Sequence, residues 1–185
     1  MKPKFLFLLL SYFFVNHNFS QFAKDGDVTI SSSSIVNEYT FLTANANQGV
    51  TSLSVNNSSL NINSAFGGNL NAGDLILIIQ MQGLTVDQTS TDLNYGSITN
   101  YNSCGNYEYA EVQSVPNGQT INLRCGLKYS YTSNGKTQII RVPRYNNLTV
   151  NSTITAPAWN GTTGGIVVIE ANEDVIINNS GNIDV

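Results

Sequence analysis

Apolar residues along this chain fall into short runs and period-two alternations, and no segment keeps apolar residues at helical spacing over a dozen positions. Polar segments rich in Asn, Ser, Thr and Gly separate the runs, and Asn and Gly tolerate the left-handed backbone conformations of turns. The pattern therefore predicts an all-β fold. We expect a small antiparallel β sandwich or barrel over residues 21–145, followed by the first rungs of a parallel β-helix over residues 146–185.

The first part of the pattern predicts short strands and two hairpins. The continuous apolar run from Leu75 to Ile79 is typical of a strand that is buried on both faces. One hairpin is expected around the turn at 116–118 (PNG), and a second around Asn134-Gly135, the preferred dipeptide of a type I′ turn. Further predictions are short strands at 51–55 and 60–62 and a flexible linker at 20–34.

From residue 146 onward, short apolar bursts alternate with Asn- and Gly-containing turns and show no hairpin signature. This arrangement is typical of a right-handed parallel β-helix, in which inward Val and Ile stack between coils and turn asparagines form ladders. Inward positions are predicted at Ile166, Val168, Val175 and Ile177. Because a stack needs about three repeats and a cap, we expect a longer solenoid to begin here. The alternative is that these runs complete a second sheet of the upstream domain.

The first twenty residues have the features of a secretory signal peptide. Lys2 and Lys4 precede an apolar run from Phe5 to Val15, and the segment ends on the small residue Ser20. The run is about half the roughly 20 residues that cross a bilayer. We therefore expect a secreted or cell-surface protein with no transmembrane segment after signal removal.

Loss of this segment changes the available chemistry. It removes the only histidine, His17, and leaves six basic against twelve acidic side chains, a formal charge of −6. Ser-His-Asp and Cys-His nucleophilic sites and His-ligated zinc are then excluded within the chain. Nucleic acid is not expected as a partner, because its binding depends on basic residues that neutralise phosphates.

Two cysteines, Cys104 and Cys125, remain in a chain directed to an oxidising compartment. A disulfide between them is predicted, and it would stabilise the fold by about 3 kcal/mol in the chain-entropy account. The alternative is two free or metal-binding thiols, although no further Cys or His exists to complete a metal shell.

The carboxylates do not form a recognisable catalytic pair. Glu108 and Glu111 are three residues apart, so on a regular strand they point to opposite faces. We predict no catalytic residues, no metal site and no cofactor. Aromatic residues offer a different chemistry, because sugars stack on exposed rings, and the candidate positions are Trp159, Tyr129 and Tyr131. The alternative is that the tyrosines pair across strands and that the tryptophan plugs one end of the helix.

Several segments together resemble a known class of proteins. They are AGDLILIIQMQG (72–83), GNYEYAEVQSV (105–115), QTINL (119–123), KTQIIRVPRYNNLTV (136–150), TAPAWNGTTGGIVVIEA (155–171) and GNIDV (181–185). Their succession resembles the N-terminal region of large secreted, surface-displayed adhesin-like proteins of gliding Gram-negative bacteria. The resemblance implies a small β domain that leads into a β-helix, and export through the type IX system, which recognises a C-terminal sorting domain.

These observations favour a non-catalytic N-terminal capping and structural segment of a secreted, cell-surface, adhesin-like β-solenoid. Its partner would be a surface polysaccharide or another surface protein. The alternatives are the N-terminal part of an extracellular β-helix carbohydrate-active enzyme, either a polysaccharide lyase or a hydrolase, and a carbohydrate-binding module. Consecutive rungs with carboxylates in register would favour the enzyme, whereas Gly-rich repeats and a terminal sorting module would favour the adhesin.

Overall fold

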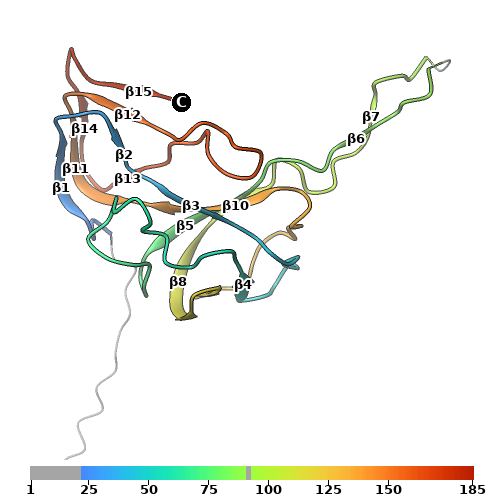
Figure 1. The fold of residues 1–185 in the computed structure, drawn as a ribbon, viewed down its shortest axis with the longest axis horizontal. Helices are drawn as coiled ribbons and strands as arrows, with labels where there is room; N and C mark the ends of the chain where they lie inside the picture. The colour runs from blue at the N-terminus through green and yellow to red at the C-terminus, as the bar shows by residue number, and fades with distance from the viewer. Residues whose placement is uncertain (1–21, 91–92) are drawn as a thin grey trace, which may run out of the picture.

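A computed structural model describes residues 22–90 and 93–185, and the expected signal peptide at 1–20 lies outside the described residues. The described chain is all-β and contains no helix. Figure 1 shows two stacked β units and a projecting two-stranded arm. The predicted all-β class is confirmed.

Six antiparallel strands form the first unit, a barrel. They pair in the order β3 (Glu38–Phe41), β10 (Thr137–Val142), β5 (Leu75–Gln80), β8 (Tyr107–Asn117), β9 (Thr120–Leu123) and β4 (Ser52–Ser54). A bridge between Leu42 and Val55 joins the two edge strands. The Thr43 N–H donates to the Ser54 carbonyl at 3.0 Å on the same seam. The curled sheet therefore brings the ends of its two edge strands together, which gives the unit a barrel-like form.

Strand β5 is buried on both faces, as predicted. Ile76 and Ile78 point into the barrel core, whereas Leu77 packs in a second apolar cluster on the outer face. Its neighbours on the two sides are β10 and β8. The five consecutive apolar residues from Leu75 to Ile79 fit a strand that is covered on both faces.

One predicted hairpin is confirmed and the other is wrong. Strands β8 and β9 pair around the turn after Asn117. Residues 127–131 form no strand with β10, because β3 and β5 already occupy both sides of β10. Tyr131 instead bridges to Ala46. No strand forms at 60–62 either, where the backbone of Leu60 turns with a φ of 41°.

The second unit consists of three stacked parallel coils. Its first sheet contains β1 (Gly26–Ile30), β11 (Arg144–Val150), β13 (Glu170–Ala171) and β14 (Val175–Ile177). Its second sheet contains β2 (Ser34–Ile35), β12 (Thr153–Thr155) and β15 (Asn182–Asp184). All pairings in both sheets are parallel. These are rungs of a parallel β-helix, and their shared core contains Leu148, Val150 and Ile154.

The first rung lies where a flexible linker was expected. Residues 26–30 and 34–35 pair with β11 and β12, so the chain builds one coil before it enters the barrel and two coils after it leaves. Residues 26–35 thus belong with the parallel coils, not with the antiparallel unit. The alternating pattern of GDVTI places Val28 and Ile30 against the coil core.

Residues 166–169 connect the two units. Val167 and Ile169 pack against the coil core, whereas Ile166 and Val168 pack on the outer face of the barrel sheet. The predicted inward positions at Ile166 and Val168 are therefore wrong for the coil, because alternate side chains of this extended run point to opposite faces.

Two buried side-chain amides attach this segment to the barrel. The Asn37 amide nitrogen donates to the carbonyls of Arg141 at 3.0 Å and Val168 at 2.7 Å, and its oxygen accepts from the Val168 N–H at 3.0 Å. In the same way, the Gln138 amide exchanges two hydrogen bonds with the backbone of Gly164. Both amides are fully buried and attach the backbone of the segment to the outer face of the barrel sheet.

One partly buried and one buried tyrosine at this junction predict an alkaline limit to stability. Burial and the Glu38 charge raise the pKa of Tyr39 to about 12, and burial and the Asp25 charge raise the pKa of Tyr145 to about 12. An unfolded tyrosine ionises near pH ~10. The folded state therefore binds more protons than the unfolded state between these values, and its stability falls as pH rises through this window.

We expect the free energy of unfolding to be maintained up to pH ~10 and to decrease between pH ~10 and pH ~12. Urea unfolding midpoints over this range measure the effect, with tyrosinate absorbance as a readout of tyrosine ionisation in the chain as a whole. Midpoints that stay constant throughout the range would contradict the expectation.

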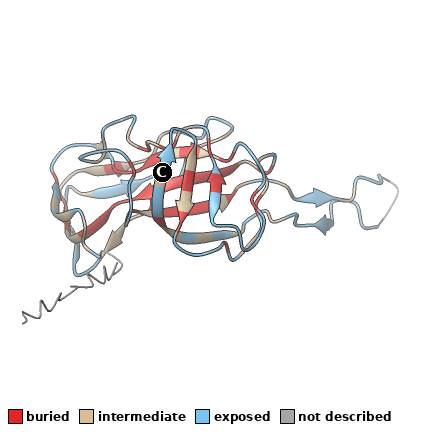
Figure 2. Ribbon diagram, turned by 90° about the horizontal axis from the view of Figure 1, so that it is seen from below, coloured by how far each residue is buried: buried red, intermediate tan, exposed pale blue. Residues whose placement is uncertain are grey.

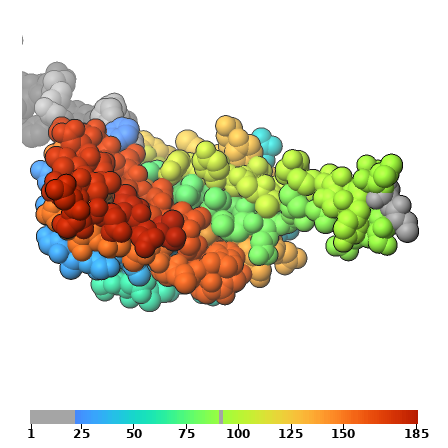
Figure 3. Space-filling model, turned by 90° about the horizontal axis from the view of Figure 1, so that it is seen from above, coloured from blue at the N-terminus to red at the C-terminus, as the bar shows by residue number. Residues whose placement is uncertain are grey.

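A two-stranded arm projects from the barrel. Strands β6 (Thr85–Val86) and β7 (Ile98–Asn100) pair with each other only, among the described residues. Figures 1 and 3 show the arm extending away from the opposite pole, where the last coil lies, and Figure 2 shows it as exposed. Large apolar side chains along it are solvent-exposed: Leu84, Val86, Leu93, Tyr95 and Ile98.

Candidate functional site

The two predicted disulfide partners are separate free cysteines. Cys104 donates its thiol to the Met81 carbonyl at 3.5 Å, and Cys125 follows Arg124, whose N–H donates to the Glu111 carbonyl. Cys104 lies just before Tyr107 at the start of β8, whereas Cys125 lies beside Glu111 on the same strand. The strand from Tyr107 to Glu111 is about 13 Å long at 3.3 Å per residue. A disulfide needs Cα atoms within about 7 Å. In this structure both cysteines are free thiols, which does not support the predicted disulfide.

The three candidate sugar-stacking residues occupy different places. Tyr131 is 1% exposed, lies in the barrel core and donates its hydroxyl to Glu108 at 3.0 Å, so it offers no ring face to a ligand. Burial and the Glu108 charge raise the pKa of Tyr131 above its usual range. Trp159 is 38% exposed on the loop before Gly165. Tyr129 is half-buried beside a cleft on the barrel surface.

That cleft, of about 320 Å³, is lined by Gly105, Asn106, Tyr107, Glu108, Lys128 and Tyr129, and we name it the tyrosine cleft. It contains two partly exposed aromatic rings. Tyr107 does not pair with Tyr129 across strands, because Tyr129 lies in no strand. The sequence signal for this site was the Tyr-x-Tyr alternation, which did not reveal that only Tyr107 and not Tyr109 lines the cleft.

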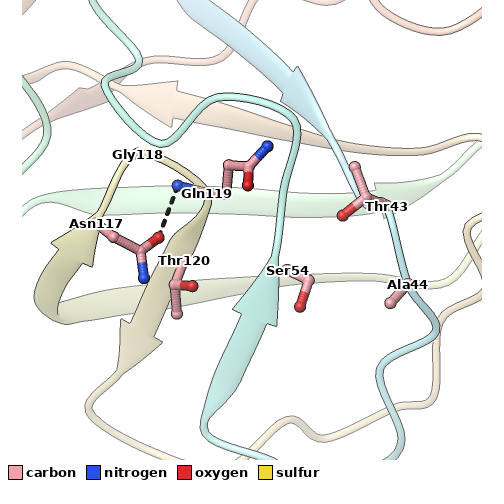
Figure 4. Close-up of a pocket in the computed structure, with 7 residues that line it drawn as sticks. All are labelled: Thr43, Ala44, Ser54, Asn117, Gly118, Gln119 and Thr120. Atoms are coloured by element: carbon pink, nitrogen blue, oxygen red, sulfur yellow. Dashed lines mark hydrogen bonds between the residues drawn. The ribbon is translucent and has the colours of Figure 1, made fainter.

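A larger pocket of about 730 Å³ lies at the closing seam of the barrel (Figure 4). Its lining combines hydroxyl, amide and backbone groups from the loop after β3, from β4 and from the β8–β9 turn: Thr43, Ala44, Ser54, Asn117, Gly118, Gln119 and Thr120. The Asn117 side-chain oxygen accepts the Gln119 N–H at 2.9 Å and so shapes the turn. No titratable group lines the pocket, so its own side chains cannot perform acid–base chemistry.

The last coil exposes an apolar surface, which we name the open rung. In register, Val175 stacks on Leu148 and Ile177 on Val150, so the predicted inward positions at 175 and 177 are confirmed. Although Leu148 and Val150 are buried, Val175, Ile177 and Ile183 are about half-exposed. Within the described chain, β14 pairs with β11 alone and β15 with β12 alone, so each has a free backbone edge.

Polar ladders run along the turns of the same coils, as predicted. The Asn146 amide donates to Asp27 at 3.0 Å and accepts from the Asn172 amide at 3.2 Å. A second ladder joins Asn178 to Asn151 at 2.6 Å. Hydrogen bonds from Asn146 and Asn147 hold the pKa of Asp27 below its usual range. Each rung therefore offers the next one matching amides at fixed positions.

The opposite end of the coil stack lies under a barrel loop. A groove of about 470 Å³ separates the first coil from residues 63–67, and its lining includes Ile30, Val36 and Phe66. Arg141 fixes this loop: its guanidinium stacks 3.9 Å from the Phe66 ring and donates to the Gly68 carbonyl at 2.7 Å. It also pairs with Asp74 at 2.9 Å. Sequence reasoning missed Arg141 because its partners are dozens of residues away.

Several carboxylates are engaged in structural bonds. Glu38 accepts the backbone N–H groups of Ile62 and Asn63, Glu111 pairs with Arg124, and Glu170 pairs with Arg144. Among residues 22–90 and 93–185, no group of three or more Cys, Asp or Glu side chains is arranged to hold a metal ion. Over the same residues, no helix is long and apolar enough to cross a membrane.

No protein-family model and no curated protein matches the chain. Among solved structures it is similar to three tailspikes. The Gp54 tailspike of Acinetobacter baumannii bacteriophage AP22, solved with a capsular saccharide, aligns at TM-score 0.37 and 19% identity over 70% of this chain. The gp61 tailspike of Pseudomonas phage phi297 aligns at 0.35 and 10% over 70%. The gp49 tailspike of Pseudomonas phage LKA1 aligns at 0.31 and 14% over 85%.

The chain spans between 19% and 28% of the length of these tailspikes. Because the TM-scores and identities are low, the likeness identifies neither a family nor an activity for this chain.

Proposed function

We propose that this chain is a non-catalytic cap of a secreted, surface-displayed β-solenoid with an adhesive role. The barrel and its loop cover one end of the coil stack, and the open rung receives a further parallel coil at the other end. The observation that carries the proposal is the asymmetry between these two ends, since only one has its apolar groups covered by a barrel loop.

The open rung has the features of a surface that binds another coil. It combines half-exposed inward side chains, free strand edges and amides of Asn172 and Asn178 in ladder positions. A free, apolar strand edge is a template for pairing with another strand. Solenoid coils gain much of their stability from the interface with their neighbours. A further coil would bury Val175, Ile177 and Ile183 in the way that the last coil buries Leu148 and Val150.

The signal-like segment at 1–20 supports export, and the structural bonds of Glu38, Glu111 and Glu170 support a non-catalytic role. The covered end supports the capping role. A loop held by Arg141 lies across a groove from the first coil, and we infer that it hinders end-to-end strand pairing there.

Ile177→Lys tests the open rung in the chain that remains after signal removal. We expect the unmodified chain to associate reversibly at high concentration, and this variant to remain monomeric because a charge on the rung opposes apolar contact. Sedimentation velocity over a range of concentrations measures the association. Ile98→Lys on the arm is a matched control, because Ile98 is 48% exposed and Ile177 is 51% exposed. Association that is lost only in the control would contradict the proposal.

The size of the native product tests the wider proposal. An antibody against residues 22–185 would be used on cell-surface and secreted fractions. A product far above the 20.1 kDa of this chain is expected. A product at or below that mass that stays monomeric would overturn the solenoid role and favour a compact binding domain.

A further inference from the structure

The tyrosine cleft has a rigid base that is set by one carboxylate. Glu108 accepts the Lys128 N–H at 2.8 Å, the Tyr129 N–H at 3.1 Å and the Tyr131 hydroxyl at 3.0 Å. These bonds fix the backbone that carries the Tyr129 ring beside strand β8, and that ring packs partly against the barrel core. The aromatic wall of the cleft is therefore preorganised, which lowers the entropic cost of ligand binding.

The remaining polar groups of the cleft are mostly donors without partners. Among the described residues, no hydrogen bond or ion pair engages the Asn106 amide, the Lys128 ammonium or the hydroxyls of Tyr107 and Tyr129, although the Lys128 ammonium lies 5.1 Å from the Tyr129 ring centroid. The Glu108 carboxylate already accepts from three donors of the protein. A ligand that fits this set presents a flat apolar face to the rings and acceptor oxygens to Lys128 and Asn106.

We propose that the tyrosine cleft binds an acidic saccharide, with a sugar ring stacked on Tyr107 and Tyr129 and its carboxylate on Lys128. The axial hydrogens of a pyranose ring form an apolar face that covers an aromatic ring, and its hydroxyls bond to the Asn106 amide. The site fits one or two sugar units, because the cleft is small and open at the surface.

The charge of the whole chain does not oppose this ligand strongly. The net charge is −4 before signal removal and −6 after it. Exposed charges beyond about 8 Å are largely screened at physiological ionic strength, whereas Lys128 would contact the sugar carboxylate directly. A charge-assisted hydrogen bond at this distance is stronger than a neutral one.

Calorimetric titration of the chain with a short oligogalacturonate tests the site, and the fully methyl-esterified oligomer is the neutral control. We expect the acid to bind at least about five times more tightly than the ester, a difference of roughly 1 kcal/mol. Lys128→Gln should abolish this preference and the salt dependence of binding. Equal binding of acid and ester to the unmodified chain would overturn the acidic specificity.

Two tyrosine variants test the position of the site. Tyr107→Ala should weaken binding about tenfold, and Tyr109→Ala should leave it unchanged. The two residues are matched controls, because they lie two positions apart on the same face of β8 and are 58% and 54% exposed. Asn106→Ala should reduce the affinity less than Tyr107→Ala. Equal losses in the two tyrosine variants, or no binding to the unmodified chain, would overturn the assignment.

Discussion

Replacement of Asn37 by alanine is expected to destabilise the protein by about 3 kcal/mol. The substitution removes three hydrogen bonds and leaves both backbone groups of Val168 without their partners at a buried site. A buried polar group that loses its partner costs about 1–3 kcal/mol. The summed loss is moderated by relaxation of residues 164–169, which are otherwise attached to the barrel by Gln138 and Tyr39.

Urea unfolding followed by circular dichroism measures this effect as a lower midpoint with an unchanged slope. Asn69→Ala is the matched control, because Asn69 is exposed and its side chain makes no hydrogen bond in the described structure. The control should stay within about 0.5 kcal/mol of the unmodified chain. A loss below about 1 kcal/mol for Asn37→Ala would show that this amide does not join the two units.

Removal of the Asp74 carboxylate is expected to cost about 3–5 kcal/mol. Asp74 and Arg141 form an ion pair at 2.9 Å with side chains that are 6% and 5% exposed. Asp74→Ala leaves the Arg141 guanidinium buried without its counter-charge, and loss of one partner of such a pair is strongly destabilising. The substitution also removes the hydrogen bond that the Asn71 N–H donates to the Asp74 carboxylate at 2.8 Å. The loop over the first coil should loosen as a result.

A comparison of two ion pairs makes this prediction specific. Glu111→Gln disrupts a pair whose arginine side chain, Arg124, is 38% exposed, so the loss should be at most about 1 kcal/mol. The double variant Asp74→Ala with Arg141→Met should be more stable than Asp74→Ala alone, since it removes the isolated charge. Similar losses from Asp74→Ala and Glu111→Gln would contradict the role given to burial.

The sequence predicted those elements whose signals are local. The run from Leu75 to Ile79 indicated a doubly buried strand because its apolar positions are contiguous, and the 116–118 turn indicated a hairpin through its residue types. The stacking of Val175 and Ile177 and the asparagine ladders followed from the repeat pattern of the coils. In each case the relevant residues are neighbours in the sequence or recur at regular intervals.

The predictions that failed concern contacts between distant residues. Residues 26–30 pair with a strand about 120 positions later, so nothing near them in the sequence indicates their partner. Asn134-Gly135 favours a tight hairpin turn locally, but the flanking strand β10 is already paired on both sides. The tyrosine cleft combines β8 with a loop about twenty residues further along the chain. Whether Tyr131 is buried or exposed depends on the direction in which that loop points.

The insertion of the barrel between two rungs determines the order in which the chain can fold. Strand β1 leaves the ribosome long before β11, and its register places Gly26 opposite Tyr145. The barrel begins and finishes at neighbouring residues, since Glu38 pairs with Arg141, so its strands can close while β1 remains unpaired. Domains generally fold as units, the N-terminal ones first, and distant pairings form slowly. Strand β1 is therefore expected to dock last, onto β11, after the barrel has formed.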